Sequence, residues 1–334
     1  MKHAKFFSIF VFAAVLGYGV VAFYFLPLAT FQGELTRMGL LPEALFGWTK
    51  PQPAIDIKWL QQSSMREADV LVIGDSFSAS RVWQSVLTQH GLKVRTESWD
   101  SMRGICTDFM PWVRAQGFAG KYVVLESIER NLVDDLGKSV ACEHMQYHPN
   151  PHTDVAVYPP AVSFDVHQGN YSGKLSTGIQ TQLNVMKYER LSSTPNFSSW
   201  LLPNDVRMAR VPNGCELFSH TSCKDALFLS YDKPEEVDAT ALMNIEKLNA
   251  RLKDITPIWV FVPNKSTAYL YPDKQFWNEA ERRFHAPNLL RMTQQAIQAK
   301  TVDLYLGNNT HFSTTGYLLM GDEIFKAIQA AQIR

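Results

Sequence analysis

Two short polar segments, far apart in the chain, hold the residues best suited to chemistry. The first is Gly74-Asp75-Ser76, which directly follows the apolar, β-branched run 70–73. Such a run predicts a buried parallel strand that delivers Ser76 to the turn before a helix. Backbone N–H groups at a helix start lack partners within the helix, so they can stabilise negative charge beside a serine. The pattern indicates a nucleophile with part of an oxyanion hole, or a turn that merely caps the next helix.

The second segment is Asn308-Asn309-Thr310-His311, which lies in a polar loop ahead of an amphipathic C-terminal helix. It follows residues 302–306, which resemble a short strand. Parallel α/β sheets gather their active sites at the carboxyl ends of their strands. His311 could therefore reach Ser76 from this loop and act as its general base.

The elements that must position these residues alternate along the chain. We predict strands at 70–73, 94–98, 122–125, 258–262 and 302–306. Helical patterns separate them, and this alternation predicts a three-layer α/β/α fold around a central parallel sheet. We expect one such domain over 69–334, preceded by a lead-in at 32–68. A long, irregular insertion is expected at about 137–245.

The N-terminus predicts a membrane anchor. Lys2 and Lys5 precede an uncharged, apolar run over 6–31, and about 20 apolar residues are enough to cross a bilayer. A cleaved signal peptide is the alternative, but its apolar core is usually shorter, about 7–15 residues. Positive residues ahead of the span predict a cytoplasmic N-terminus in the inner membrane, with residues beyond 31 exported to the periplasmic side.

Charge and cysteine content agree with an exported globular body. The 32 basic and 32 acidic residues balance, so no nucleic acid or other polyanion is indicated as a partner. Four cysteines in an oxidising compartment suggest two disulfides, with three possible pairings. The short separation of Cys215 and Cys223 favours a pair, which leaves Cys106 with Cys142. No spacing matches a CxxC or HExxH pattern, so we expect neither a metal nor a cofactor.

Three segments together resemble a known family. Gly74-Asp75-Ser76-Phe77-Ser78 resembles the nucleophile block of SGNH (GDSL-type) hydrolases. Residues 262–269, Val-Pro-Asn-Lys-Ser-Thr-Ala-Tyr, and Asn309-Thr310-His311-Phe312 are similar to segments of alginate O-acetylation proteins of the AlgJ/AlgX type. The resemblance covers about 69–135 and 255–330. It implies an SGNH or flavodoxin-like fold with Ser76 as nucleophile and His311 as base.

The chain departs from this family at the catalytic acid and in the order of its motifs. Asn308 and Asn309 occupy the positions where the family carries an aspartate, and an amide lacks the charge that stabilises an imidazolium. Three alternatives stay open. Another acid serves (Asp303, Glu126 or Glu129), or Ser76 and His311 act as a dyad, or catalysis is lost. The serine precedes the histidine, as in SGNH esterases, whereas in alginate proteins the histidine block comes first.

Two further positions are candidates for binding the oxyanion or the substrate. Gly104 occupies the place where SGNH-like proteins use a glycine N–H in the oxyanion hole, or it is a plain helix-start glycine. Arg130 could bind an oxyanion or a sugar carboxylate, or pair with Glu126 or Glu129. Asn131 is a weaker candidate for a displaced oxyanion donor.

The resemblance implies an anchored, exported O-acetyltransferase that modifies a cell-envelope or secreted polysaccharide through an acetyl-serine. It also implies a multispanning membrane O-acyltransferase as the partner that supplies acetyl groups. Two alternatives remain: a carbohydrate acetyl esterase that uses the same residues, and a non-catalytic glycan-binding or scaffold subunit of a polysaccharide acetylation complex. The Asn308 and Asn309 positions favour the non-catalytic alternative, whereas the presence of both Ser76 and His311 argues against it.

Overall fold

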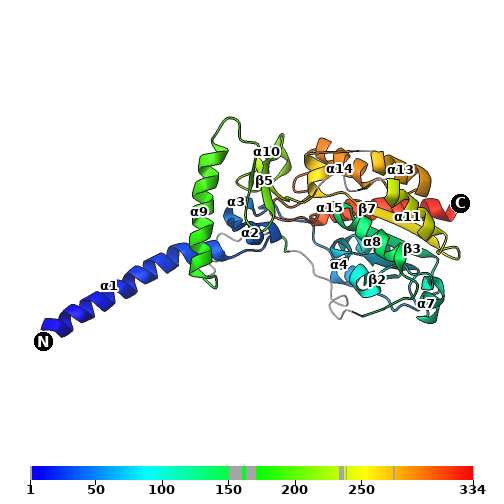
Figure 1. The fold of residues 1–334 in the computed structure, drawn as a ribbon, viewed down its shortest axis with the longest axis horizontal. Coiled ribbons are helices and arrows are strands. Elements are labelled where there is room, and N and C mark those ends of the chain that lie inside the picture. The colour runs from blue at the N-terminus through cyan, green and yellow to red at the C-terminus, as the bar shows by residue number, and fades with distance from the viewer. Residues whose placement is uncertain are drawn as a thin grey trace. The chain divides into compact units, whose positions relative to one another are not determined.

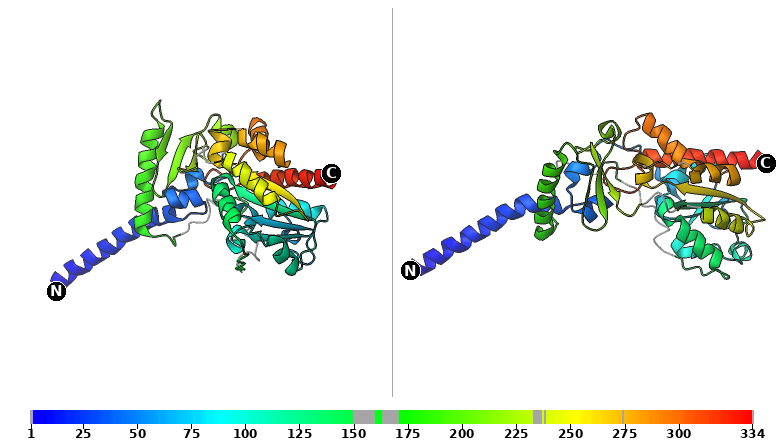
Figure 2. Two further views of the ribbon diagram at one scale, coloured as in Figure 1. Left: turned by 45° about the vertical axis from the view of Figure 1, so that its right-hand side comes forward. Right: turned by 45° about the horizontal axis from the view of Figure 1, so that its top comes forward.

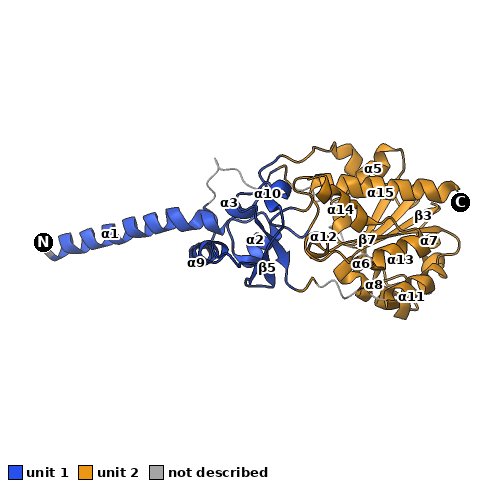
Figure 3. Cartoon of the chain, turned by 90° about the horizontal axis from the view of Figure 1, so that it is seen from above, with its two compact units in different colours: residues 1–50, 162–230, 306–310 blue, residues 51–161, 231–305, 311–334 orange. Residues whose placement is uncertain are grey.

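The computed structural model describes residues 2–149, 160–162, 171–232, 237, 239–273 and 275–333. The chain divides into two compact units (Figure 3). Unit 1 comprises residues 1–50, 162–230 and 306–310, and unit 2 comprises residues 51–161, 231–305 and 311–334. Figure 1 shows the elements of both units.

Unit 2 contains a four-stranded parallel sheet, which confirms the predicted central parallel sheet. Its strand order is β2-β1-β3-β7, and every neighbouring pair is parallel. The strands are β1 (Val70–Gly74), β2 (Val94–Ser98), β3 (Tyr122–Ile128) and β7 (Thr256–Val262). All residues of β1 and β3 are buried, as expected for strands covered on both faces. The four carboxyl ends meet at one edge of this sheet.

Helices connect these strands and pack on one another. The helix α15 packs along α5 and α14, and α11 packs along α8. The helical elements of unit 2 are η2 (Ile57–Leu60), α4 (Ser76–Ala79), α5 (Val82–Gln89), α6 (Trp99–Met102), α7 (Phe109–Ala115), α8 (Glu129–Ala141), α11 (Ala239–Asn249), α12 (Lys265–Tyr269), α13 (Gln275–Phe284), α14 (Leu289–Gln298) and α15 (Thr314–Ile333).

The strand predicted at 302–306 does not join the sheet. Asp303 has a left-handed backbone (φ 55°), which breaks the extended conformation that a strand requires. Tyr305 instead forms a single antiparallel bridge with Phe312, and the Ser313 N–H donates to the Leu304 carbonyl at 3.0 Å. Residues 304–305 and 312–313 therefore run antiparallel to each other, and the loop between them carries His311.

Unit 1 combines an N-terminal apolar helix with a small antiparallel sheet of order β4-β5-β6. Its elements are α1 (Lys2–Phe25), η1 (Leu26–Ala29), α2 (Glu34–Gly39), α3 (Glu43–Phe46), α9 (Leu175–Ser192), β4 (Ser199–Leu201), β5 (Val206–Arg210), α10 (Gly214–Leu217) and β6 (Asp225–Leu229). Leu35, Phe46, Val206 and Leu227 form part of its core. Within the section expected to be irregular, the described residues 171–230 thus form helices and strands that pack around this core. Part of the expected lead-in also folds into unit 1.

The helical stretch over residues 3–29, which comprises α1 and η1, is long and apolar enough to cross a membrane. Its most apolar part has a mean hydropathy of 2.3, and none of that part is buried. The four cysteines pair as expected from their spacing. Cys106 and Cys142 lie at disulfide distance within unit 2, and Cys215 and Cys223 do so within unit 1. Disulfides are compatible with an extracytoplasmic location.

Candidate active site

The structure brings Ser76 and His311 together at the carboxyl edge of the parallel sheet. Ser76 Oγ lies 2.8 Å from His311 Nε2, although the residues are 235 positions apart in the chain. Ser76 is exposed, so a substrate can reach its hydroxyl. The Phe77 ring lies 4.8 Å from the imidazole and is itself fully buried, so it supports one side of His311. This geometry suits proton transfer from a serine to a histidine.

Asp75 shapes the turn that presents the nucleophile. One carboxylate oxygen, Oδ1, accepts the Phe77 N–H at 2.8 Å and caps α4. The other, Oδ2, accepts the Ile128 N–H at 2.8 Å and ties the turn to the end of β3. Asp75 thus fixes the backbone on both sides of Ser76. The cap was part of the sequence interpretation, but the bond to Ile128 carried no sequence signal.

The buried carboxyl group of Glu126, on β3, holds this turn through two hydrogen bonds. Glu126 Oε2 accepts the Ser78 hydroxyl at 2.6 Å and the Asp75 N–H at 3.1 Å. Gly74 makes this approach possible, because a Cβ at that position would lie 2.6 Å from Glu126 Oε2. Burial, and then the neighbouring Asp75 carboxylate, raise the pKa of Glu126 well above its ordinary range. Glu126 is therefore engaged in holding the turn.

The two asparagines at the expected acid positions have other contacts. Within unit 1, the buried Asn308 side chain donates to Glu43 Oε2 at 2.6 Å. Glu43 Oε1 also accepts the Gly33 N–H at 2.7 Å, so this carboxyl group joins α3 to the loop. The Asn309 N–H donates to the Leu306 carbonyl at 3.2 Å. Sequence reasoning missed Glu43, because nothing in its neighbourhood points to a partner 265 residues away.

The other two candidate acids, Glu129 and Asp303, have partners of their own. Glu129 Oε2 accepts the Asn264 N–H at 2.8 Å. Asp303 is buried, and its charge acts on Lys265 of α12. Burial lowers the pKa of Lys265, while Asp303 and Asp232 oppose that shift. Lys265, Asp232 and Asp303 thus form a buried charged cluster beside the end of β7.

Arg130 pairs with neither of the glutamates expected as its partners. Its guanidinium lies 3.8 Å from Asp232 Oδ1 and donates weakly to Asn264 Oδ1 at 3.5 Å. The Arg130 side chain is 13% exposed, so only its edge reaches solvent. The next residue, Asn131, is exposed. Asp232 lies about a hundred residues beyond Arg130 in the sequence, and no spacing rule could have identified it.

Gly104 lies beyond the carboxyl end of β2, in the loop after α6, and lines a small cleft with Trp99, Arg103 and Asp135. Its backbone is left-handed (φ 143°), and an added Cβ would lie 3.1 Å from the Ser139 backbone. Glycine is therefore required at this position for structural reasons. Among the described residues, the N–H groups of Ser76 and Gly104 donate to no other residue.

Asp135 is a second carboxyl group with a raised pKa, and it lies on α8, the helix that follows β3. Burial raises its pKa to about 7, although the Ser127 hydroxyl donates to it at 2.8 Å and opposes that shift. The Asp75 carboxylate contributes in the raising direction. Perturbed groups of this kind concentrate at functional sites. Sequence reasoning did not single out Asp135, because it lies on an ordinary amphipathic helix.

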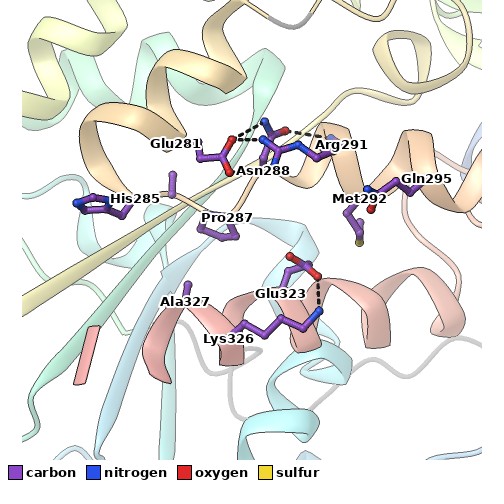
Figure 4. Close-up of a pocket in the computed structure, with 11 residues that line it drawn as sticks. Glu281, His285, Pro287, Asn288, Arg291, Met292, Gln295, Glu323, Lys326 and Ala327 are labelled. Atoms are coloured by element: carbon purple, nitrogen blue, oxygen red, sulfur yellow. Dashed lines mark hydrogen bonds and ion pairs between the residues drawn. The ribbon is translucent and has the colours of Figure 1, made fainter. Parts of the chain in front are cut away.

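A larger cleft of about 310 Å³ opens elsewhere on unit 2, among α13, α14 and α15 (Figure 4). Its charged groups satisfy one another: Arg291 pairs with Glu281, and Lys326 donates to Glu323 at 2.7 Å. Neither Ser76 nor His311 lines it. Its lining offers no nucleophile beside a base, so the Ser76 turn remains the better candidate for catalysis. Within the described residues, no three His, Cys, Asp or Glu side chains could hold a metal ion together.

No protein-family model, curated protein or solved structure matches this chain.

Proposed function

We propose that this chain is an SGNH-like acyltransferase in which Ser76 is the nucleophile and His311 the general base. The observation that carries the proposal is the 2.8 Å contact between Ser76 Oγ and His311 Nε2 at the carboxyl edge of a parallel sheet. The order of strands and the helices that pack on one another are compatible with a three-layer SGNH arrangement.

The proposed reaction has two halves. Ser76 Oγ attacks the carbonyl carbon of an acetyl donor while its proton passes to His311 Nε2. The tetrahedral intermediate collapses, the leaving group takes that proton, and an acetyl-serine remains. His311 then takes the proton of an acceptor hydroxyl, whose oxygen attacks the acetyl carbon. The bond from that carbon to Ser76 Oγ breaks, and His311 returns the proton to Oγ, which regenerates Ser76.

The N–H groups of Ser76 and Gly104 are the proposed oxyanion donors. Both belong to segments that follow neighbouring strands, β1 and β2, at the same edge of the sheet. Neither group is used by another described residue, so both are free to stabilise the developing negative charge. Asp75 keeps the first donor in place through its bonds to Phe77 and Ile128.

The proposed acceptor is a cell-envelope or secreted polysaccharide, and the proposed acetyl source is a multispanning membrane O-acyltransferase. Both come from the resemblance to the alginate O-acetylation proteins. The long apolar helix α1 and the two cysteine pairs agree with a body anchored in the inner membrane and exported from the cytoplasm. In the esterase alternative, water replaces the polysaccharide hydroxyl.

The experiment that tests this function compares hydrolysis of an aryl acetate by the full chain and by two variants. Ser76→Ala should lower kcat/KM at least about 10³-fold, and His311→Gln should lower it by about 10²–10⁴. Ser64→Ala, at an exposed serine of the same unit, is the matched control and should change nothing. Wild-type rates in Ser76→Ala would exclude the proposed nucleophile. Added oligosaccharide then separates transfer from hydrolysis.

A further inference from the structure

The helix α9 of unit 1 has large apolar residues on its exposed side, whereas an ordinary surface helix has them on its buried side. The side that faces the unit carries small or polar residues: Gly178, Thr181, Asn184 and Tyr188 are all buried. Asn184 Nδ2 donates to the carbonyls of Gly39 and Leu40 at 3.2 and 3.1 Å. The Tyr188 hydroxyl donates to Asp225 Oδ2 at 3.1 Å. Hydrogen bonds therefore provide part of the attachment of α9 to unit 1, together with the Tyr188 ring, which packs on Phe46 in the core of that unit.

The apolar residues of α9 point outward. Ile179, Leu183 and Met186 are 40%, 54% and 58% exposed, and their spacing of four and three residues places them on one side of the helix. A helix in water normally presents this side to a core. We call these three residues the outward face of α9. Three separate large apolar side chains aligned on one helix face indicate an interaction surface.

The end of the apolar helix α1 meets the beginning of α9 within the same unit. Gly178 allows this approach, because a Cβ there would lie 1.9 Å from the Phe25 carbonyl oxygen. The Phe23 ring stacks on Tyr171 just ahead of α9, with the centroids 5.8 Å apart. Figures 1 and 2 show α9 starting beside the end of α1 and running across it at a steep angle. A helix so placed would lie along the surface of the bilayer that α1 is proposed to cross.

We propose that the outward face of α9 binds the surface of a lipid bilayer, the same one that α1 enters. Contact with the lipid-spanning helix is what favours a bilayer over a protein partner. The exposed charges on and beside α9 are Lys174, Lys187 and Arg190 against Glu189, so a net positive charge flanks the apolar face. That combination is typical of interfacial helices on anionic lipids. Tyr24 near the end of α1 and Tyr171 just ahead of α9 are 68% and 46% exposed, and aromatic residues are enriched at membrane interfaces.

Unit 1 would then be held by two elements, one that crosses the membrane and one that lies on it. This inference uses only unit 1, so it stands or falls independently of the proposed reaction of Ser76.

A depth measurement tests the proposal. The native cysteines are paired, so Leu183→Cys in the full chain can be labelled with an environment-sensitive fluorophore and reconstituted in phosphatidylcholine/phosphatidylglycerol vesicles. Glu189→Cys, exposed on another side of the same helix, is the matched control. An interfacial helix buries its apolar face about 5–10 Å into the headgroup boundary. Lipids brominated high on the acyl chain should therefore quench the probe at 183 at least roughly two-fold and the probe at 189 little.

Equal quenching at both positions, or none at 183, would overturn the proposal. A blue-shifted probe at 183 that brominated lipid does not quench would also overturn it, because a second copy or another protein would then cover the face. Met186→Cys, labelled in the same way, repeats the test at a second outward position in case the first variant misfolds.

Discussion

Glu126 offers the sharpest test of how the turn that carries Ser76 is stabilised. In the folded chain its carboxyl group is fully buried beside Asp75, and burial raises its pKa well above the ordinary 4.5. In the unfolded chain the same group ionises near 4.5. Between these two pKa values, the folded state keeps a proton that the unfolded state releases. The contribution of Glu126 to stability is therefore complete below the unfolded pKa and declines as the pH rises toward the folded one.

The magnitude follows from proton linkage. Each pH unit between the two pKa values removes about 1.4 kcal/mol from the free energy of unfolding of the wild type. Glu126→Gln carries no proton, so it escapes this loss. Its amide oxygen can still accept the bonds from Ser78 and Asp75, and any mismatch in those bonds is independent of pH. The stability of the variant relative to wild type should therefore rise steadily with pH.

Thermal unfolding of the full chain in detergent, followed by tryptophan fluorescence between pH 5 and pH 8, measures this difference. For a unit of roughly 150–250 residues, each kcal/mol shifts Tm by about 2–4 °C, so the difference in Tm should grow by about 3–6 °C per pH unit while the pH lies between the two pKa values. Glu143→Gln, at an exposed glutamate, is measured in parallel as the control. A difference in Tm for Glu126→Gln that does not change with pH would refute the reasoning, because Glu126 would then ionise equally in both states.

Three further predictions concern other parts of the molecule. Asn308→Ala removes a donor from the buried Glu43 carboxyl group, so the free energy of unfolding should fall by about 1–3 kcal/mol, whereas Asn308→Asp places two acidic groups side by side and should destabilise unit 1 more. Equal stability of the wild type and both variants in a denaturant titration would contradict this. Burial raises the pKa of Asp135 from 3.8 to about 7, so the contribution of Asp135 to stability is lost as the pH rises through that interval. Asp135→Asn should therefore raise Tm at about pH 7 but little at about pH 4, and a larger rise at the lower pH would contradict this reasoning. Replacing the Cys106–Cys142 pair by serines opens a loop of 36 residues and should lower the free energy of unfolding by about 4 kcal/mol, whereas opening the 8-residue loop of Cys215–Cys223 should lower it by about 2–3 kcal/mol. A smaller loss of stability for the longer loop, measured by denaturant titration, would contradict the chain-entropy argument.

The strands of the central sheet could be predicted where apolar residues dominate, as in Val70–Ile73 and Ile258–Val262, and from their alternation with helical segments where they do not, as in Val94–Ser98. Val70–Gly74 and Tyr122–Ile128 are buried throughout, and such runs leave little ambiguity. The false strand at 302–306 is apolar except at Asp303. It fails because Asp303 adopts a left-handed backbone, which aspartate tolerates better than most residues but which a single aspartate does not predict. The small antiparallel sheet escaped prediction because β4–β6 are short and lie among polar residues.

The two ends of the candidate site could be anticipated, but their supporting groups could not. Ser76 and His311 each follow a recognisable local pattern, and parallel topology predicts that such positions share an edge. The contacts that hold them depend instead on pairs distant in sequence, such as Glu43 with Asn308 and Asp75 with Ile128. Single-sequence periodicity carries no information on such pairs, so these residues emerge only from the folded chain.

The most direct test of the central proposal is a search for an acetyl group on Ser76. The full chain is mixed with an aryl acetate, quenched in acid, and analysed by intact mass and peptide mapping, beside Ser76→Ala. We expect one acetyl group on the peptide that contains Ser76 and none on that peptide in the variant. An adduct that persists in Ser76→Ala, or the absence of an adduct and of turnover in both chains, would contradict the assignment of Ser76 as nucleophile.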